Sequence, residues 1–367
     1  MLTEHPELFL QEGARRKLIW FAQYMQASFQ PTPFHRAYYD VLDRFAKRQI
    51  KNLIIQAPPQ HGKSQGSSRF LPAQMLGLYP DIKIAICSYA ATIAKDFNRD
   101  VQRLIDCDEY RNIFPETVLN GSNVVTVANN YLRNSDVFEI VNHTGSLRVV
   151  GRGGSLTSKT VDVMIFDDLY KDSQEANSPQ IRATAWDWYT KVARTRLHND
   201  SQQLIVFTRW HPDDIIGKII ESEKVIFAES WADLENVPND TWVLVNFEAI
   251  KTGPATEIDN REPGTPLWEI RHSLERLLAL KQLDPVGFQC LYQGDPGNAE
   301  GKLYQPFKTW VEKAKLAIDT LIMTVAMEIA GLDVVCENEI EGIVLTGPIG
   351  SATEPFNFED EINKYFK

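Results

Sequence analysis

Residues 51–64 read KNLIIQAPPQHGKS, a short apolar stretch followed by a loop that ends in Gly-Lys-Ser. A loop of this kind between a strand and a helix is typical of phosphate-binding loops, although Ala57 stands where the GxxxxGK[ST] motif has its first Gly. In such loops backbone N–H groups and the lysine hold phosphate oxygens, and the hydroxyl binds Mg²⁺. The alternative is a chance match in a surface turn. The candidate nucleotide-binding residues are Gln60, His61, Gly62, Lys63 and Ser64.

Apolar strands and helical patterns alternate on both sides of this loop, as a parallel sheet with crossover helices requires. The alternation is interrupted at 124–147, where Asn-rich and Gly-rich breaks predict antiparallel hairpins beside the sheet. We expect an α/β fold, a three-layer P-loop NTPase with a mainly parallel central sheet and antiparallel additions. Further strands are predicted at 83–90, 161–168 and 202–208, and helices at 15–26, 34–48, 92–106 and 178–197.

Two adjacent acids end the strand VDVMIFDD, residues 161–168. Carboxylates at a neighbouring strand end suit the Mg²⁺ that a phosphate loop requires. Asp167 is the candidate metal ligand together with Ser64, and Asp168 is the candidate catalytic residue that orients or deprotonates the attacking water. The alternative is that both acids only cap the turn after the strand.

A third strand end carries Thr208 and Arg209 in FTRWHPDD. Ligands of parallel sheets bind beyond the carboxyl ends of the strands, so these residues could sense the γ-phosphate. Arg209 could instead form a structural ion pair. His211 with Asp213 and Asp214 also suggests a metal site, which we regard as the weaker interpretation.

Two other segments offer polar groups to a nucleotide. The Gly-rich loop before residue 161 contains Arg152, a candidate arginine finger or a solvated loop residue. Gln30, Phe34 and His35 precede the phosphate loop and could hold adenine by stacking and hydrogen bonding. Helix capping and packing explain these last three residues almost as well.

The composition is that of a folded protein without an export signal. In 367 residues, 49 Asp plus Glu against 38 Lys plus Arg give a net charge of −11, which argues against coating nucleic acid by bulk charge. The cysteines form no CxxC pair, so we expect neither a disulfide framework nor a cysteine zinc site. No apolar run is long enough to span a membrane, and we expect a cytoplasmic protein. The cysteines are Cys87, Cys107, Cys290 and Cys336.

Several segments together resemble the ATPase part of phage terminase large subunits over about residues 15–310. In order they are APPQHGKS, ICSYAATIAKDFNRDVQ, VGRGGSLTSKTVDVMIFDDLYKDSQEANS, WDWYTKVARTRL, VFTRWHPDDIIGKI and LYQGDP. The resemblance is to the branch whose second acidic motif reads DD. It implies a motor that uses ATP and Mg²⁺ to pump double-stranded DNA into a procapsid. It also implies a homo-oligomeric ring docked on the portal protein in the host cytoplasm, and a small terminase subunit as partner.

The same resemblance implies residue roles that agree with those read from the strand ends. It makes Lys63 and Ser64 the nucleotide-loop residues, Asp167 the Mg²⁺ carboxylate, Asp168 the catalytic acid, Thr208 with Arg209 the coupling motif and Arg152 the preferred finger.

The chain departs from this family after residue 310, where an RNase H-like nuclease domain normally follows. Residues 311–367 weakly resemble a segment of acetate-kinase-like and actin-like ATPases, and we expect a small α/β appendage without nuclease activity. Asp319, Glu328 and Asp333 are therefore not assigned as nuclease ligands.

The expected divisions are N-terminal helices with an adenine-side segment at 1–50, an ATPase core at 51–250, a lid or linker at 251–310 and the appendage at 311–367. Two rival functions stay open. One is a catalytically inert prophage remnant or assembly protein that binds nucleotide or portal. The other is a helicase-like DNA translocase, although no second motor domain is evident.

Overall fold

A computed structural model describes residues 6–125, 131–156 and 160–299. The chain divides into two units, Met1–Tyr304 and Gln305–Lys367, and every described residue lies in the first. The predicted appendage at 311–367 and Cys336 therefore lie outside the described residues.

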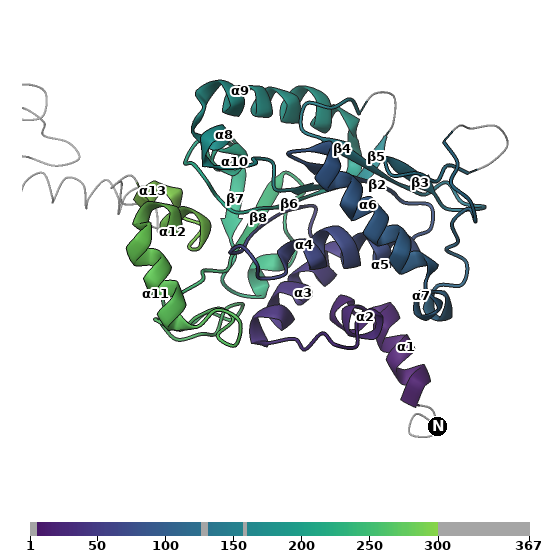
Figure 1. Cartoon of the computed structure of the whole chain (residues 1–367), viewed down its shortest axis with the longest axis horizontal. Helices are drawn as coiled ribbons and strands as arrows, with labels where there is room; N and C mark the ends of the chain where they lie inside the picture. Colours follow the sequence, from purple (N-terminus) through teal and green to yellow (C-terminus); the bar gives the residue numbers. More distant parts are fainter. Residues whose placement is uncertain (1–5, 126–130, 157–159, 300–367) are drawn as a thin grey trace, which may run out of the picture. The chain divides into compact units, whose positions relative to one another are not determined.

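The described residues build one eight-stranded sheet in the order β3-β4-β2-β5-β6-β1-β8-β7 (Figure 1). All neighbouring strands are parallel except β3 and β4 at one edge. The strands are β1 Asn52–Gln56, β2 Lys83–Ser88, β3 Val137–Glu139, β4 Ser146–Gly151, β5 Val161–Asp167, β6 Leu197–Val206, β7 Lys224–Phe227 and β8 Thr241–Asn246.

Helices cover both faces of this sheet and form separate apolar cores there. Successive strand residues point to opposite faces, so Leu53 and Ile55 lie in one core and Ile54 in the other. The first core includes residues of α2, α3, α5 and α6, and the second includes residues of α9 and α10. The helices are α1 Pro6–Arg16, α2 Leu18–Met25, α3 Pro33–Ala46, α4 Lys63–Gln65, α5 Leu71–Leu78, α6 Ala91–Asp106, α7 Asp108–Ile113, α8 Ser173–Asn177, α9 Pro179–Trp188, α10 Ile215–Ser222, α11 Leu274–Leu283, α12 Pro285–Leu291 and α13 Pro296–Ala299.

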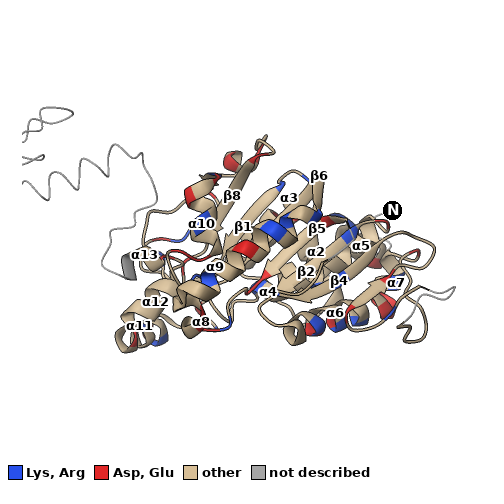
Figure 2. Ribbon diagram, turned by 90° about the horizontal axis from the view of Figure 1, so that it is seen from above, with Lys and Arg blue, Asp and Glu red and all other residues tan. Residues whose placement is uncertain are grey.

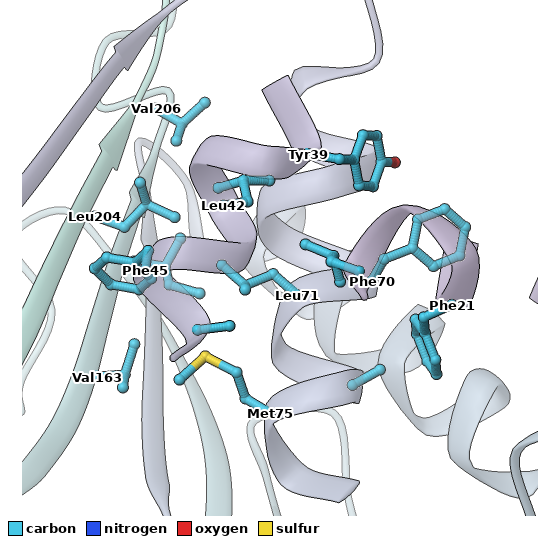
Figure 3. Packing of buried hydrophobic residues seen from close by; sticks show 14 of the residues in the cluster. Phe21, Tyr39, Leu42, Phe45, Phe70, Leu71, Met75, Val163, Leu204 and Val206 are labelled. Carbon is cyan, nitrogen blue, oxygen red and sulfur yellow. The ribbon is translucent and has the colours of Figure 1, made fainter. Parts of the chain in front are cut away.

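The first core fixes α3 and α5 against the sheet (Figure 3). Leu42 and Phe45 of α3 and Leu71 of α5 are fully buried beside Leu204 of β6. Burying a side chain of this size contributes about 2 kcal/mol to stability. This packing sets the position of the chain before and after β1, which carries the phosphate-loop motif.

The sequence-based fold class is confirmed, with three differences in detail. The antiparallel pairing expected at 124–147 is present between β3 and β4 and in isolated bridges that join Arg133 to Val124 and Phe138, but β4 also pairs with β2 in parallel. The helix expected after the phosphate loop is interrupted by a π-helical turn at Gly66–Phe70. Strands β7 and β8 were not foreseen, and β8 pairs with β1.

Charge on α6 is balanced within the helix and its neighbours (Figure 2). Lys95 pairs with Asp136 at 3.0 Å, Arg103 pairs with Asp100 at 3.0 Å, and Arg99 pairs with its helix neighbour Asp96. Each basic residue of α6 is therefore neutralised by a carboxylate. Among the described residues, no helix is both long and apolar enough to cross a membrane.

Candidate functional site

The loop between β1 and α4 has a sharply bent backbone. Gln60 has φ 63° and Gly62 has φ 80°, the left-handed region in which only glycine is unstrained. The first helical turn then receives support from the core, because the Lys63 carbonyl accepts hydrogen bonds from Tyr38 Oη at 2.5 Å and Ser67 Oγ at 2.8 Å. The bent loop thus opens directly into a helix N-terminus, a backbone arrangement suited to an anion.

The acidic end of β5 meets this helix. Ser64 Oγ donates to Asp167 Oδ1 at 3.0 Å, and Ser68 Oγ donates to Asp167 Oδ2. Lys63 Nζ lies 3.3 Å from Asp168 Oδ2. Asp168 has φ 46°, and its buried Oδ1 has no hydrogen-bond partner among the described residues. These contacts bring the phosphate loop and the paired aspartates together, as expected from the strand ends, and the roles of the residues stay predictions.

Burial governs the electrostatics of Asp167. Burial and, to a smaller extent, the charge of Asp168 raise the pKa of this carboxyl to about 6, although Lys63 and the hydroxyls of Ser68 and Ser64 oppose the shift. A cation beside Asp167 would favour its charged form. A serine hydroxyl, a buried carboxylate and the unpartnered Asp168 Oδ1 nearby form an oxygen donor set that fits Mg²⁺.

Arg209 is paired with a neighbour in sequence. Its Nε donates to Asp214 Oδ2 at 2.7 Å, and both side chains are buried. Asp214 also caps α10, because its Oδ1 accepts the Gly217 N–H at 3.0 Å. This geometry matches the structural ion pair considered from the sequence. Thr208, directly before Arg209, is buried, and the coupling role of both residues stays a prediction.

The metal site considered at His211 gains no support. Asp214 is occupied by Arg209, and His211 Nδ1 accepts the Asp213 N–H at 2.9 Å. In the part of the chain that the structure describes, no group of three or more His, Cys, Asp or Glu side chains could hold a metal ion.

Arg152 lies beside the acidic turn. Its guanidinium donates to the Leu169 carbonyl at 2.6 Å and to Glu175 Oε2 at 2.8 Å. Arg152 thus contacts the backbone of the residue that directly follows Asp168, the candidate catalytic residue. Its role as a finger stays a prediction.

The candidate adenine-binding residues lie in different surroundings. Gln30 is exposed, whereas Phe34 and His35 are buried. Phe34 packs edge-on against Phe247 at 5.1 Å between ring centroids. His35 Nδ1 accepts the Thr32 N–H at 3.2 Å and forms a capping box with it at the start of α3. Packing and capping therefore occupy Phe34 and His35, and adenine binding stays a prediction.

Sequence reasoning missed other residues that contact the site. Ser68 follows Ser64 by four positions, which places both hydroxyls on the same helix face, so this residue could have been found. Tyr38 and His272 carry no local signal. His272 Nε2 donates to the Gln60 carbonyl at 3.3 Å across 212 positions of sequence.

Solved phage terminases share limited similarity with this chain. The large terminase ATPase domain of Thermus phage P74-26, in a mutant form, has a TM-score of 0.44 and 13% identity, covering 74% of this chain and 96% of that chain. The large terminase of a thermophilic bacteriophage, in complex with ADP, has a TM-score of 0.37 and 9% identity, covering 71% and 53%. Both scores are below 0.5, so they do not by themselves establish a shared fold.

Two curated archaeal proteins match a short stretch. The UPF0285 protein of Methanothermobacter thermautotrophicus is 39% identical over 69 residues, and that of Methanococcus aeolicus is 43% identical over 70 residues. Each match covers 19% of this chain and 20% of the relative. The chain thus spans about a fifth of the length of the curated relatives it matches.

A family profile gives the broadest match. The profile described as "Terminase large subunit, T4likevirus-type, N-terminal" matches residues 54–309, which include the last residues of β1, the phosphate loop, the paired aspartates at the end of β5 and the end of β6. Through this match over most of its length, the chain belongs to the family of terminase large subunits.

Proposed function

We propose that the chain is the ATP-hydrolysing motor subunit of a phage terminase, which translocates double-stranded DNA into a procapsid. The observation that carries this proposal is the convergence of Lys63 and Ser64 with Asp168 and Asp167, at 3.3 and 3.0 Å, in a member of the terminase family. Because a P-loop ATPase needs a phosphate-binding lysine, a metal-binding hydroxyl and strand-end carboxylates together, this convergence supports nucleotide hydrolysis.

Binding of the triphosphate would rearrange the ion pair of Lys63. A phosphate oxygen that approaches Lys63 Nζ competes with Asp168 Oδ2, which now lies 3.3 Å away. The backbone N–H groups at the start of α4 would bind the same phosphates. Gln60, His61 and Gly62 supply the bend that leads into this turn. Binding would therefore release the carboxylate of Asp168 from its cation.

Hydrolysis would use the released carboxylate. Asp168 would accept a hydrogen bond from the attacking water, whose oxygen bonds to the γ-phosphorus while the bond to the ADP oxygen breaks. Ser64 and Asp167 would hold Mg²⁺, which neutralises charge on the β and γ oxygens when bound. Arg152, Thr208 and Arg209 remain the candidates for finger and coupling roles, and Gln30, Phe34 and His35 those for the adenine side.

The cellular role rests on family membership. We propose double-stranded DNA, the portal protein and a small terminase subunit as partners of a homo-oligomeric ring that docks on the procapsid in the host cytoplasm. The match at 54–309 supports this assignment. We also propose the division of the chain at residues 50, 250 and 310, which is supported by the fact that β1–β8 all fall within 51–250. We further propose that residues 311–367 have no nuclease activity.

Measurement of DNA-stimulated ATP hydrolysis tests the proposal. Lys63→Ala should abolish hydrolysis, because it removes the cation that binds phosphate. Lys191→Ala, which removes an exposed lysine of the surface pair with Asp187, should leave it unchanged. Hydrolysis that does not depend on Lys63 contradicts the proposal, and nucleotide binding without any turnover favours the inert assembly protein.

A further inference from the structure

A segment far from the phosphate loop in sequence packs directly on it. Residues 267–272, here named the strap, follow the strand β8 and place the His272 ring on the His61 ring, with centroids 4.3 Å apart and planes 19° apart. His272 Nε2 also donates to the Gln60 carbonyl at 3.3 Å. The strap thus contacts the loop through both a ring stack and a hydrogen bond.

The strap also contacts the loop's other neighbour, α3. Trp268 packs edge-on against His35, with centroids 4.5 Å apart. A Cβ atom built on Gly62 would lie 3.9 Å from His35 Nε2, so His35 flanks the bend. Trp268 therefore contacts a residue that flanks the bend, while His272 contacts the loop itself.

The strap has its own attachment to the sheet. The Leu267 N–H donates to the Ala249 carbonyl at 2.8 Å, and the His272 N–H donates to the Trp268 carbonyl at 2.8 Å. Ala249 lies shortly after β8, the strand that pairs with β1. The two rings are consequently held by backbone bonds that do not involve the phosphate loop.

The loop conformation needs such support. Gln60 is not a glycine and yet has φ 63°, a conformation that an L-residue adopts at an energetic cost. The buried His61 uses Nδ1–H to donate to the Pro59 carbonyl at 2.8 Å, and its Nε2 has no hydrogen-bond partner in the described part of the chain. The His61 ring also meets Phe34 and Trp268 edge-on, with centroids 6.2 and 6.3 Å apart, and its stack on His272 is shorter than either contact at 4.3 Å.

We propose that the strap is a positioning element of the nucleotide site, in which His272 and Trp268 keep the bend at residues 60–62 in the conformation that binds phosphate. The inference rests on the proposed function of this loop. Without the strap, the loop would have to be ordered when nucleotide binds. Ordering one additional residue corresponds to roughly tenfold weaker binding.

Equilibrium titration with ADP and steady-state ATP hydrolysis test this inference. His272→Ala should raise both the ADP dissociation constant and the KM for ATP by about tenfold, with kcat changed less than about twofold. His272→Phe keeps a ring for the stack and should recover most of the affinity. The matched control is Ile270→Ala, in the same strap. Because the Ile270 side chain is 93% exposed, this variant should leave the ADP dissociation constant and the KM for ATP unchanged.

Each outcome bears on a different proposal. Unchanged ADP affinity in His272→Ala, with normal binding by the unmodified protein, overturns the positioning role alone. An equal loss in His272→Phe and His272→Ala overturns the role of the stack. If His272→Ala does not fold, Trp268→Leu applies the same affinity test to the contact with His35. A native protein that binds no ADP overturns the proposed function itself.

Discussion

The buried ion pair between Arg209 and Asp214 gives the sharpest test of how the end of β6 works. The side chains are 5% and 0% exposed, and Nε lies 2.7 Å from Oδ2. Removing one partner leaves a buried charge uncompensated, which costs about 3–5 kcal/mol of unfolding free energy. We expect this loss in both Arg209→Met and Asp214→Asn. The double variant leaves neither charge, so it should cost at least ~2 kcal/mol less than the sum of the single losses.

Urea denaturation of the four proteins, with ATP hydrolysis measured on the same samples, completes this cycle. The denaturant dependence should have the same slope in all of them, so that midpoints report stability. If the free energy of unfolding of Arg209→Met lies within about 0.5 kcal/mol of that of the native protein and the variant nevertheless loses ATP hydrolysis, the reasoning from burial is wrong. Arg209 would then belong to the nucleotide site, as the coupling interpretation holds. Additive losses would equally refute the pairing argument.

Two other predictions concern protonation and the Gly-rich loop. Burial lowers the pKa of His35 to about 4 and that of His61 to about 3, so the unfolded chain binds more protons below pH 6.5. The free energy of unfolding should therefore fall as the pH is lowered from 6.5 to 4, by roughly 3 kcal/mol for His35 alone. A free energy of unfolding, measured by urea denaturation, that does not change over this pH range contradicts the prediction. Arg152→Ala should lower ATP turnover and leave ADP affinity unchanged. Glu175→Gln, which removes only the carboxylate that lies 2.8 Å from Arg152, should retain turnover. Equal turnover in Arg152→Ala and the native protein contradicts the role of Arg152 as an arginine finger.

The parallel sheet could be predicted because its central strands are continuous apolar runs. Residues of β1 are buried throughout, as expected for a strand covered on both faces. The pair β7 and β8 was missed although Thr241–Asn246 is equally apolar and almost entirely buried. Between these two strands the chain forms only a short 3₁₀ turn, Ala232–Leu234, and no α-helix. The sequence pattern of a crossover helix was therefore absent, and the strands predicted from the sequence ended at residue 208.

The residues of the candidate site were likewise predicted only in part from the sequence. Lys63, Ser64 and the paired aspartates were predictable because parallel strands bring their carboxyl ends to one edge of the sheet. The strap was not, because Trp268 and His272 act by packing on residues more than 200 positions away, in a Pro-rich and Gly-rich segment without periodicity. Topology rules place residues that follow strands, whereas such long-range packing leaves no local pattern.

The sheet order explains why the paired aspartates and the strap both act through the phosphate loop. β6 lies between β1 and β5, and strands are about 4.8 Å apart, so the ends of β1 and β5 are separated by about 10 Å. The contacts with the aspartates consequently come from α4 and the π-helical turn that follows it, while the strap contacts Gln60 at the start of the bend. Only His61, Gly62 and Lys63 separate Gln60 from Ser64. A displacement of the strap should therefore move the backbone that presents Lys63 to phosphate. Measurement of the ADP dissociation constant detects this movement as a change in nucleotide affinity.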